Sequence, residues 1–552
     1  MIQQRTQTIL AWASVVALAL AASLSGISNG FAFDDLHIIV EDNRTHSLAH
    51  WWQLFAQSYW PIEKGGDLYR PITMLGFAVQ WAIGNGAPLV FHIVSVALYA
   101  LICAVFFAVL LELLPLGAAW LGAALFAVHP VHVEAVGNVV GQSELLASLF
   151  MFLAVLVFLR ARRRGSLSLR DIAVIVLLYI LGCLSKEHAI VLPALLLAAE
   201  ATIFATQAPF RARLATVRLL MVALAVAGVA FIWVRIHVLG PSAAGTDESN
   251  SLLVGQPFGI RLLTMLRVML EWIRLFFWPA HLSADYSPRA IELVTGPSSE
   301  MIASAAIIIG FTGLAWKARH RVPVASFAFL WAAVALLIPS NLFVPTGFAV
   351  AERTLFLASG GVMLGVAATV AYLTENKPPL SGTARQLAIG AVGLILFLGV
   401  LRSAFRQPVW RDNQTLFTQT VSDVPASYKA HLAYAALLFQ ENRRKEAFEE
   451  VKLAHVLYPR DLDVVEYAAQ EYSRVEGCRR AVVLYNYVLT EDPGHSRSRV
   501  GLASCLIALH EHDAARKTIR EGLVIGASKP ALEQLMAIND STEAVYRQRS
   551  GN

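Results

Sequence analysis

The sequence LVFHIVSVALYALICAVFFAVL, residues 89 to 110, contains no Asp, Glu, Lys or Arg. At 1.5 Å per residue, a helix of this length extends about 33 Å, enough to cross a hydrocarbon core of roughly 30 Å. A water-soluble surface helix would instead show polar residues along one face. The stretch therefore predicts a membrane-spanning helix.

The whole chain has the composition of a polytopic membrane protein. Its 552 residues are 57% hydrophobic and 15% charged, and the mean hydropathy is +0.57. This composition excludes a soluble protein with a single core and predicts an all-α membrane bundle of about eleven spans. Several spans are short for a bilayer that needs about 20 residues. The expected spans are residues 8–27, 89–110, 116–131, 143–160, 170–185, 188–205, 217–238, 302–316, 323–341, 354–374 and 387–403.

Basic residues cluster in alternate loops and set the expected orientation. Loops that carry Lys and Arg stay in the cytoplasm, and the N-terminus with Arg5 falls on the same side. The odd number of spans then places the C-terminal region on the exported side. The net charge of +5 comes mostly from these loops and indicates contact with anionic lipid rather than nucleic acid. The clusters are Arg160, Arg162, Arg163, Arg164 and Arg170; Arg211, Arg213 and Arg218; Lys317, Arg319 and Arg321; and Lys377 with Arg385.

The first span also resembles a signal peptide, because Arg5 precedes its apolar run. A membrane anchor is favoured over a cleaved signal, since no convincing Ala-x-Ala site precedes the following loop. Short loops and alanine-rich spans suit a bacterial inner membrane with the exported side in the periplasm. An endoplasmic-reticulum location would give the same topology.

Two large loops are expected on the exported side, residues 28–88 and 240–300. The first is rich in Trp and contains a short apolar stretch, residues 72–83, that is too short to cross and suits the headgroup zone. The second contains residues 259–278, an apolar run interrupted by arginines and one glutamate. A transmembrane placement would bury these charges, so the run is expected to lie in the outer interface.

Beyond residue 404 the composition changes to that of a soluble helical domain with a repeat. Pro425, Pro459 and Pro493 are 34 residues apart, and alanines recur at two fixed offsets within each period. Small residues allow paired helices to approach, and proline ends the second helix of each pair. The alanines are Ala435, Ala469 and Ala503 at the first offset and Ala447, Ala481 and Ala515 at the second.

This pattern resembles about three tetratricopeptide repeats forming an α-solenoid at residues 425–530. The expected organisation is a membrane domain at 1–404, a linker at 405–424, the repeats, and a tail at 531–552. Gly522 departs from the repeat pattern, where a helix-packing alanine is usual. An exported location would permit a disulfide between Cys478 and Cys505, which the sequence leaves open.

The densest polar motifs all fall on the exported side of the expected spans. Ionisable residues are costly at a bilayer edge, so their collection on one face suggests a site for chemistry. The motifs are Phe33-Asp34-Asp35, Tyr69-Arg70-Pro71, His129-Pro-Val-His132-Val-Glu134, Ser185-Lys186-Glu187 and Glu352-Arg353. Three further short motifs occur in the same chain, Gly141-Gln142-Ser143-Glu144, Asn341-Leu342-Phe343 and Trp410-Arg411, and Ala351 precedes Glu352.

In their order and in the trailing repeats, these motifs resemble the transmembrane and tetratricopeptide-repeat protein O-mannosyltransferases, within the C-type glycosyltransferase superfamily. The resemblance implies transfer of a sugar, with mannose favoured, from a polyprenyl-phosphate donor to a hydroxyl of an exported polypeptide. The repeats would then contact this acceptor. No nucleotide-binding Gly pattern is present, in agreement with a lipid-linked donor. Gln142 departs from the family, which often has Arg there, so a phosphate role at that position is doubtful.

The implied reaction needs a base for the acceptor hydroxyl and positive charge for the departing lipid phosphate. By motif position Asp34 is the expected general base, with Asp35 as a positioning partner or metal ligand. Arg70, Lys186 and Arg353 are the candidate phosphate-binding residues. Structural alternatives remain for the arginines, which could pair with Asp67 and Glu352 or extend to lipid headgroups.

His129, His132 and Glu134 are candidates for substrate positioning. Pro130 interrupts the helix that would place both histidines on one face, which argues against a metalloprotease-like zinc site and leaves metal ligation or a hydrogen-bonded loop as alternatives. Glu144 is either a favourable charge at a helix N-terminus or a site residue. No cofactor is predicted with certainty beyond the lipid-linked donor, and a divalent metal stays possible.

Two other functional classes fit the composition. One is a membrane-anchored repeat scaffold without catalysis, which would not require Asp34, Arg70, Lys186 and Arg353 on one face. The other is a transporter of lipid-linked saccharides, which would place charges near mid-span and show repeated topology in its halves. The sequence shows neither transporter feature, so an enzyme is the favoured interpretation.

Overall fold

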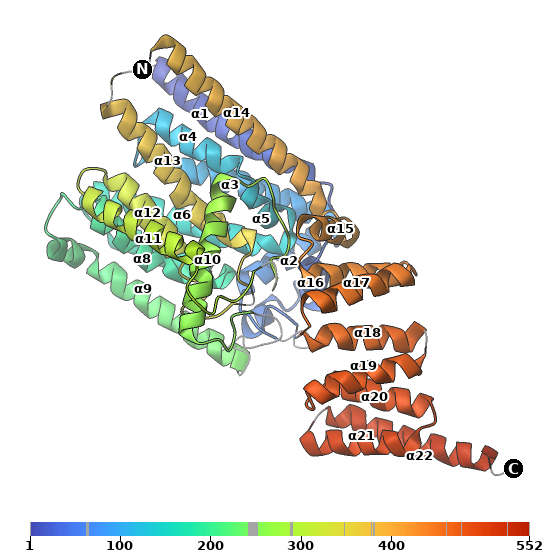
Figure 1. Cartoon of the computed structure of the whole chain (residues 1–552). Coiled ribbons are helices and arrows are strands. Elements are labelled where there is room, and N and C mark those ends of the chain that lie inside the picture. Colours follow the sequence, from blue (N-terminus) through green and yellow to red (C-terminus); the bar gives the residue numbers. More distant parts are fainter. Residues whose placement is uncertain are drawn as a thin grey trace. The chain divides into compact units, whose positions relative to one another are not determined.

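The computed structural model describes residues 2–61, 66–240, 252–287, 291–346, 348–376, 378, 381–459, 461–475, 477–526 and 528–550. Lys377, residues 241–251 of the second outside loop and the last two residues of the tail lie outside this part. The regular elements of the described residues are helices, which confirms the all-α prediction (Figure 1). The chain divides into two compact units, residues 1–286 with 291–419 and residues 287–290 with 420–552.

Fifteen α-helices begin in the described part of the first unit, with short helical turns between them. They are α1 (Ile2–Ser23), α2 (Pro71–Gly84), α3 (Pro88–Leu111), α4 (Leu116–Ala127), α5 (Val133–Gly137), α6 (Gln142–Arg163), α7 (Leu169–Ser185), α8 (Leu192–Thr202), α9 (Phe210–Leu239), α10 (Phe258–Phe277), α11 (Ser299–Ala318), α12 (Pro323–Ala335), α13 (Phe356–Asn376), α14 (Gly382–Arg406) and α15 (Asn413–Asp423).

Seven stretches within the described residues are long and apolar enough to cross a membrane. They are Arg5–Gly26, Pro88–Leu111, Val139–Arg163, Arg211–Leu239, Ser299–Ala318, Glu352–Asn376 and Gly382–Trp410. An eighth arises if α4 and the bent segment Pro130–Gly137, at 49°, form one broken span. The remaining predicted spans fall on the shorter helices α7, α8 and α12, so the count of eleven stays a prediction.

A cluster of aromatic residues forms the core of the first unit, which is called the membrane unit below. Phe106 of α3, Phe126 of α4, Phe152 of α6 and Trp331 of α12 are fully buried and in ring contact, with centroids 4.6 Å apart for Phe106 and Phe126. By contrast, the long helices α9, α11 and α14 expose apolar side chains such as Val229, which is 68% exposed. Such surfaces suit contact with lipid tails.

The first and last spans lie side by side and are joined at one end. α1 and α14 run along each other in Figure 1. Beyond α1, the Ser25 hydroxyl donates to the Ala404 carbonyl at 2.7 Å, and the Gly30 N–H donates to the Arg411 carbonyl at 2.9 Å. These bonds attach the segment that leads to the Asp-Asp pair to the segment that leaves the last span.

Charged residues occur at opposite ends of the same helices. At the end of α6, Arg160 pairs with Glu112 and Arg162 pairs with the fully buried Glu200. The beginning of α6 carries Glu144 instead, which contacts Lys186 just beyond α7. The arginines Arg160 and Arg162 therefore lie at one end of α6 and Glu144 of the polar motifs lies at the other.

The two stretches predicted to lie in the interface form the helices α2 and α10. α2 has 14 residues and packs on α3 and α7. α10 buries Met265, Val268 and Trp272 on one face. Its arginines have polar partners: Arg261 donates to the Asn341 carbonyl at 3.1 Å, and Arg274 pairs with Glu271.

The described residues of the second unit form three antiparallel helix pairs and one further helix. The helices are α16 (Tyr428–Gln440) with α17 (Arg444–Leu457), α18 (Leu462–Val475) with α19 (Cys478–Glu491), α20 (Ser496–Ala508) with α21 (His512–Ile525), and α22 (Lys529–Ser550). All six repeat alanines named above have no exposed surface. Their small side chains therefore occupy the positions where the paired helices meet.

Two local features distinguish the last repeats. Cys478 and Cys505 form a disulfide that links α19 to α20, with Cα atoms 5.0 Å apart. At Gly522, an added Cβ would lie 2.5 Å from Arg499 Cδ and 2.5 Å from Leu532 Cδ1. This crowding explains why the position departs from the alanine usual in the repeat.

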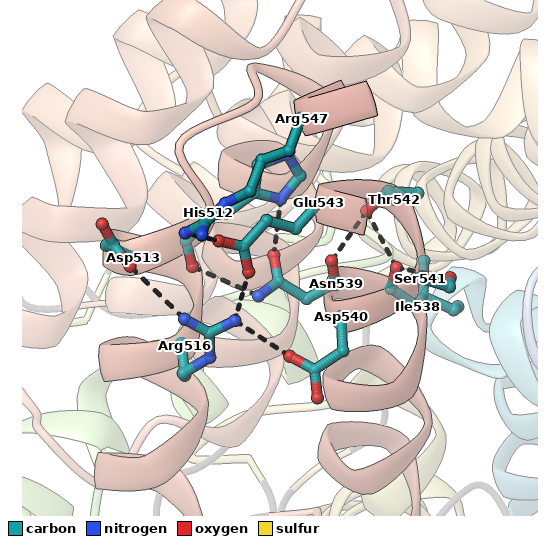
Figure 2. A network of polar contacts seen from close by, with 10 residues as sticks. All are labelled: His512, Asp513, Arg516, Ile538, Asn539, Asp540, Ser541, Thr542, Glu543 and Arg547. Carbon is teal, nitrogen blue, oxygen red and sulfur yellow. Dashed lines mark hydrogen bonds and ion pairs between the residues drawn. The ribbon is translucent and has the colours of Figure 1, made fainter. Parts of the chain in front are cut away.

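A polar network attaches the final helix to α21 (Figure 2). His512 Nδ1 lies 3.0 Å from Asn539 Oδ1, and Arg516 donates to Asp540 at 3.0 Å while also pairing with Glu543. α22 also packs apolar side chains against the pair of α20 and α21, where Leu532 lies in one buried cluster with Ala503 and Ile519.

Candidate functional site

The adjacent carboxylates Asp34 and Asp35 have different environments. Asp35 is 1% exposed, and its two oxygens accept hydrogen bonds from the N–H groups of Ala32, Val139 and Val140 at 3.4, 3.2 and 2.8 Å. Asp34 is half-buried and accepts no hydrogen bond from the described residues. Asp35 thus ties the first loop to the short helix before α6, whereas Asp34 keeps its oxygens available.

The backbone before Asp34 is held in an unusual conformation. Phe33 has a φ of 57°, in the left-handed region that is strained for a residue with a bulky side chain. Its N–H donates to Asn413 Oδ1 at 2.6 Å, and its ring contacts Phe417 with centroids 6.0 Å apart. Contacts from α15 therefore fix the turn that presents Asp34.

Burial makes both aspartates stronger bases than usual. Loss of hydration raises the pKa of Asp35 to about 7, although the N–H donors oppose the shift. Burial also raises the pKa of Asp34, and the nearby charge of Arg353 partly opposes it. A carboxylate with a raised pKa is better able to take a proton from a hydroxyl group.

Each predicted phosphate-binding cation is paired with a glutamate. Arg70 Nε donates to Glu187 Oε2 at 3.0 Å. Arg353 donates to Glu134 twice, from Nη1 at 2.6 Å and from its own backbone N–H at 2.8 Å. These partners replace Asp67 and Glu352, which the sequence offered as alternatives, and Glu352 instead accepts from Ser283 and Tyr286.

Lys186 and Glu144 form the third pair. The Lys186 ammonium donates to Glu144 Oε2, and His188 Nε2 lies 3.0 Å from Glu144 Oε1, without hydrogen-bond geometry. Sequence reasoning missed His188, although it follows the Ser-Lys-Glu motif by one residue. These three side chains form a contact between the start of α6 and the segment that follows α7.

The three pairs and Asp34 lie close enough for their charges to interact. The charges of Arg353 and Arg70 act on Asp34, and the charges of the same two arginines act on Lys186. The structure therefore gathers the predicted base and the three predicted cations, which come from four separate segments of the chain. Such a cluster can hold an anionic group beside a carboxylate.

The two histidines of the predicted positioning set lie within packed hydrogen-bonded structure. His129 Nε2 is 2.9 Å from the Phe276 carbonyl. His132 lies between the hydroxyls of Tyr99 and Ser359, at 3.0 and 2.8 Å. This arrangement corresponds to the loop alternative from the sequence, and Glu134 is the member of the motif that contacts a candidate cation.

The divergent residue Gln142 has a structural role. Its amide exchanges two hydrogen bonds with the Gln80 amide, at 2.8 and 2.9 Å, and also donates to Ser95 at 3.1 Å. Gln142 is 1% exposed, so this amide pair joins α2, α3 and α6 inside the bundle. A glutamine thus fits here without any phosphate contact.

Two further polar groups near the aspartates were not recognised from the sequence. Asn138 has no exposed surface, and neither of its amide atoms is hydrogen-bonded to a described residue; it precedes the N–H groups that bind Asp35. The buried Tyr59 hydroxyl likewise has no hydrogen-bond partner in the part of the chain that the structure describes. Single tyrosines and asparagines carry no spacing signal that would reveal such burial. Within the described residues, no group of three His, Cys, Asp or Glu is placed to hold a metal ion.

Comparisons with known proteins identify relatives over most of the chain. A family model described as a tetratricopeptide repeat matches residues 479–538. The chain is 24% identical to protein O-mannosyl-transferase TMTC3 of Mus musculus over 499 residues, covering 85% of this chain and 54% of that protein. It is 27% identical to protein O-mannosyl-transferase TMTC4 of Homo sapiens, covering 76% of this chain and 63% of the relative.

A shorter match has higher identity. The chain is 31% identical over 319 residues to protein O-mannosyl-transferase Tmtc2 of Drosophila melanogaster, which covers 55% of this chain and 33% of that protein. The chain spans between half and two thirds of the length of the mouse and human relatives. Together with the membrane-length helices, these matches support a multi-pass membrane protein that carries a tetratricopeptide repeat at residues 479–538.

Proposed function

We propose that this chain, a homologue of the protein O-mannosyl-transferases, is a membrane glycosyltransferase. It transfers a sugar, with mannose as the first candidate, from a polyprenyl-phosphate donor to a hydroxyl group of an exported polypeptide. The observation that carries the proposal is the Asp34 carboxylate, which accepts no hydrogen bond from the described part of the chain and lies within the electrostatic reach of Arg353 and Arg70.

Each group of the candidate site has a role in the proposed reaction. The acceptor oxygen forms a bond to the anomeric carbon while Asp34 takes the hydroxyl proton. The bond between the anomeric carbon and the phosphate oxygen breaks, and the lipid phosphate leaves with the electron pair. Arg70, Lys186 and Arg353 stabilise the charge that develops on this phosphate. Their glutamate partners hold the three cations in place before the donor arrives.

Asp35 acts as a positioning residue in this scheme. Its bonds to Val139 and Val140 fix the loop on which Asp34 stands, and both Asp35 oxygens already accept hydrogen bonds from backbone N–H groups. Glu134 and Glu144 act through Arg353 and Lys186. The histidines His129 and His132 support the broken helix that carries Glu134.

The tetratricopeptide repeats are proposed to contact the polypeptide acceptor. Stacked helix pairs form an extended surface suited to unfolded or extended chains, and a tethered binding surface raises the local concentration of its ligand. We expect both the site and the repeats on the non-cytoplasmic side, the periplasmic side if the membrane is a bacterial inner membrane.

Transfer by the purified full chain tests the proposal. The protein would be incubated in detergent with radiolabelled polyprenyl-phosphate mannose and an unfolded exported protein rich in Ser and Thr. Label that enters the protein and is removed by Asp34→Asn supports a transferase. If wild-type protein binds the polypeptide but transfers no label from any lipid-linked sugar, the protein acts as a scaffold and the enzymatic proposal is wrong.

A further inference from the structure

The loop before α2 folds back on itself and holds Tyr59 inside the membrane unit. The Tyr59 N–H donates to the Leu68 carbonyl at 2.8 Å, and the Trp60 N–H donates to the Asp67 carbonyl at 3.2 Å. Tyr59 is 2% exposed. Hydrogen bonds therefore hold the backbone of Tyr59 next to the Tyr-Arg-Pro motif, and its side chain is buried.

The hydroxyl of Tyr59 is buried and has no hydrogen-bond partner among the described residues. Other tyrosines of the unit behave differently: the Tyr69 hydroxyl donates to the Phe55 carbonyl at 2.7 Å, and the Tyr286 hydroxyl donates to Glu352 at 2.8 Å. A buried donor with no acceptor is unfavourable, and native proteins rarely keep one without a role. This hydroxyl is thus available for a bound molecule.

The charges around Tyr59 belong to the proposed site. Arg70 Cζ lies 5.0 Å from the centroid of the Tyr59 ring. The charges of Asp34 and Arg353 also act on the phenol group. Burial raises the pKa of Tyr59, so the hydroxyl keeps its proton and can act as a donor at any physiological pH.

We propose that Tyr59 is a further substrate-binding residue, whose hydroxyl donates a hydrogen bond to a phosphate oxygen of the lipid-linked donor. This inference rests on the proposed function. A phosphate is the favoured acceptor because the nearby guanidinium groups of Arg70 and Arg353 attract an anion to the same place. A neutral hydrogen-bond donor can then complete the set without adding charge.

The test compares Tyr59→Phe with Tyr69→Phe in the full chain. Binding of undecaprenyl monophosphate, which carries no sugar, would be measured by native mass spectrometry, together with the thermal unfolding temperature. Tyr59→Phe removes an atom to which no group in the described part of the chain is hydrogen-bonded, so we expect an unfolding temperature at or above that of wild type. We expect the lipid phosphate to bind about tenfold more weakly, the loss typical of one hydrogen bond to a charged acceptor.

The control variant gives the opposite pattern. Tyr69→Phe leaves the Phe55 carbonyl without its donor and should lower the unfolding temperature while leaving lipid-phosphate binding unchanged. Equal binding by Tyr59→Phe and wild type would overturn the inference and leave the proposed function intact. Equal weakening by both variants would also overturn it, because a general disturbance of the loop would explain the loss. Failure of wild type to bind any polyprenyl phosphate would remove the proposed function itself.

Discussion

Arg353 and Glu134 are 219 residues apart in the chain, yet both the guanidinium and the backbone N–H of Arg353 donate to the Glu134 carboxylate. This double contact joins the start of the span Glu352–Asn376 to α5, in the bent segment after α4. Glu134 is 2% exposed, so its charge depends on Arg353 for compensation.

Removal of one partner should therefore cost more stability than removal of both. Arg353→Ala leaves the Glu134 carboxylate buried without its partner cation, a change that typically costs about 3 kcal/mol of unfolding free energy. The double variant with Glu134→Ala should recover part of this loss, because no buried charge is left unpaired. Unfolding in detergent checks the cycle, and additive losses would show that the pair is not coupled.

Because the two aspartates lie in different environments, we expect their asparagine variants to lose different properties. Asp34→Asn should lower transfer by about 10²- to 10⁴-fold and leave the unfolding temperature unchanged, because Asp34 accepts no hydrogen bond from the residues that the structure describes. Asp35→Asn should lower stability by about 1–3 kcal/mol, since an amide cannot accept from all the N–H groups of Ala32, Val139 and Val140. Transfer and thermal unfolding separate the two roles. Full activity in Asp34→Asn would show that another group is the general base.

The pH profile of transfer should reflect the raised pKa of Asp34. A base must be ionised, so the rate falls when the pH drops through its pKa, and burial moves this fall above the ordinary value of 3.8. The charge of Arg353 lowers the pKa of Asp34. Its removal in Arg353→Ala should thus shift the fall to higher pH, whereas Arg353→Lys keeps the charge and should shift it less. If the fall in rate at acidic pH occurs at the same pH in both variants as in wild type, the group that titrates is not Asp34.

The sequence predicted the cations and acids of the site better than it predicted their partners. Arg70, Lys186 and Arg353 could be selected because charged residues at a membrane edge are rare and stood in recognisable motifs. Their pairing with Glu187, Glu144 and Glu134 depends on contacts between separate helices. No spacing along the chain encodes such contacts.

The same limit applies to the fold. Apolar runs revealed the long helices, and the 34-residue period revealed the repeats. Helices such as α8 (11 residues) and α12 (13 residues) end earlier than their apolar runs, because the chain leaves the helical conformation inside the protein. Composition alone does not report those ends. The bulky Phe33 in a left-handed turn is likewise invisible in sequence, since nothing in its type favours that conformation.

Deletion of residues 422–552 should separate acceptor binding from chemistry. The proposed catalytic groups all lie before residue 420, in the first compact unit. We expect the shortened protein to use a full-length polypeptide acceptor poorly and to glycosylate a short Ser/Thr peptide at a rate near that of the full chain. Initial rates with the two acceptors measure this difference. Equal loss with both would mean that the repeats support the membrane unit.

The disulfide between Cys478 and Cys505 should stabilise the last repeats. It closes a loop with a sequence separation of 27 residues, and loops of this size typically gain about 3 kcal/mol from a cross-link. The matched variants Cys478→Ser and Cys505→Ser should each lower the unfolding temperature of the repeats. Cys103→Ser provides a control at a buried cysteine in α3 that forms no disulfide. A reducing agent should lower the stability of wild type towards that of the two disulfide variants and should not affect them further. If wild type unfolds at the same temperature with and without the reductant, the bridge does not stabilise the repeats.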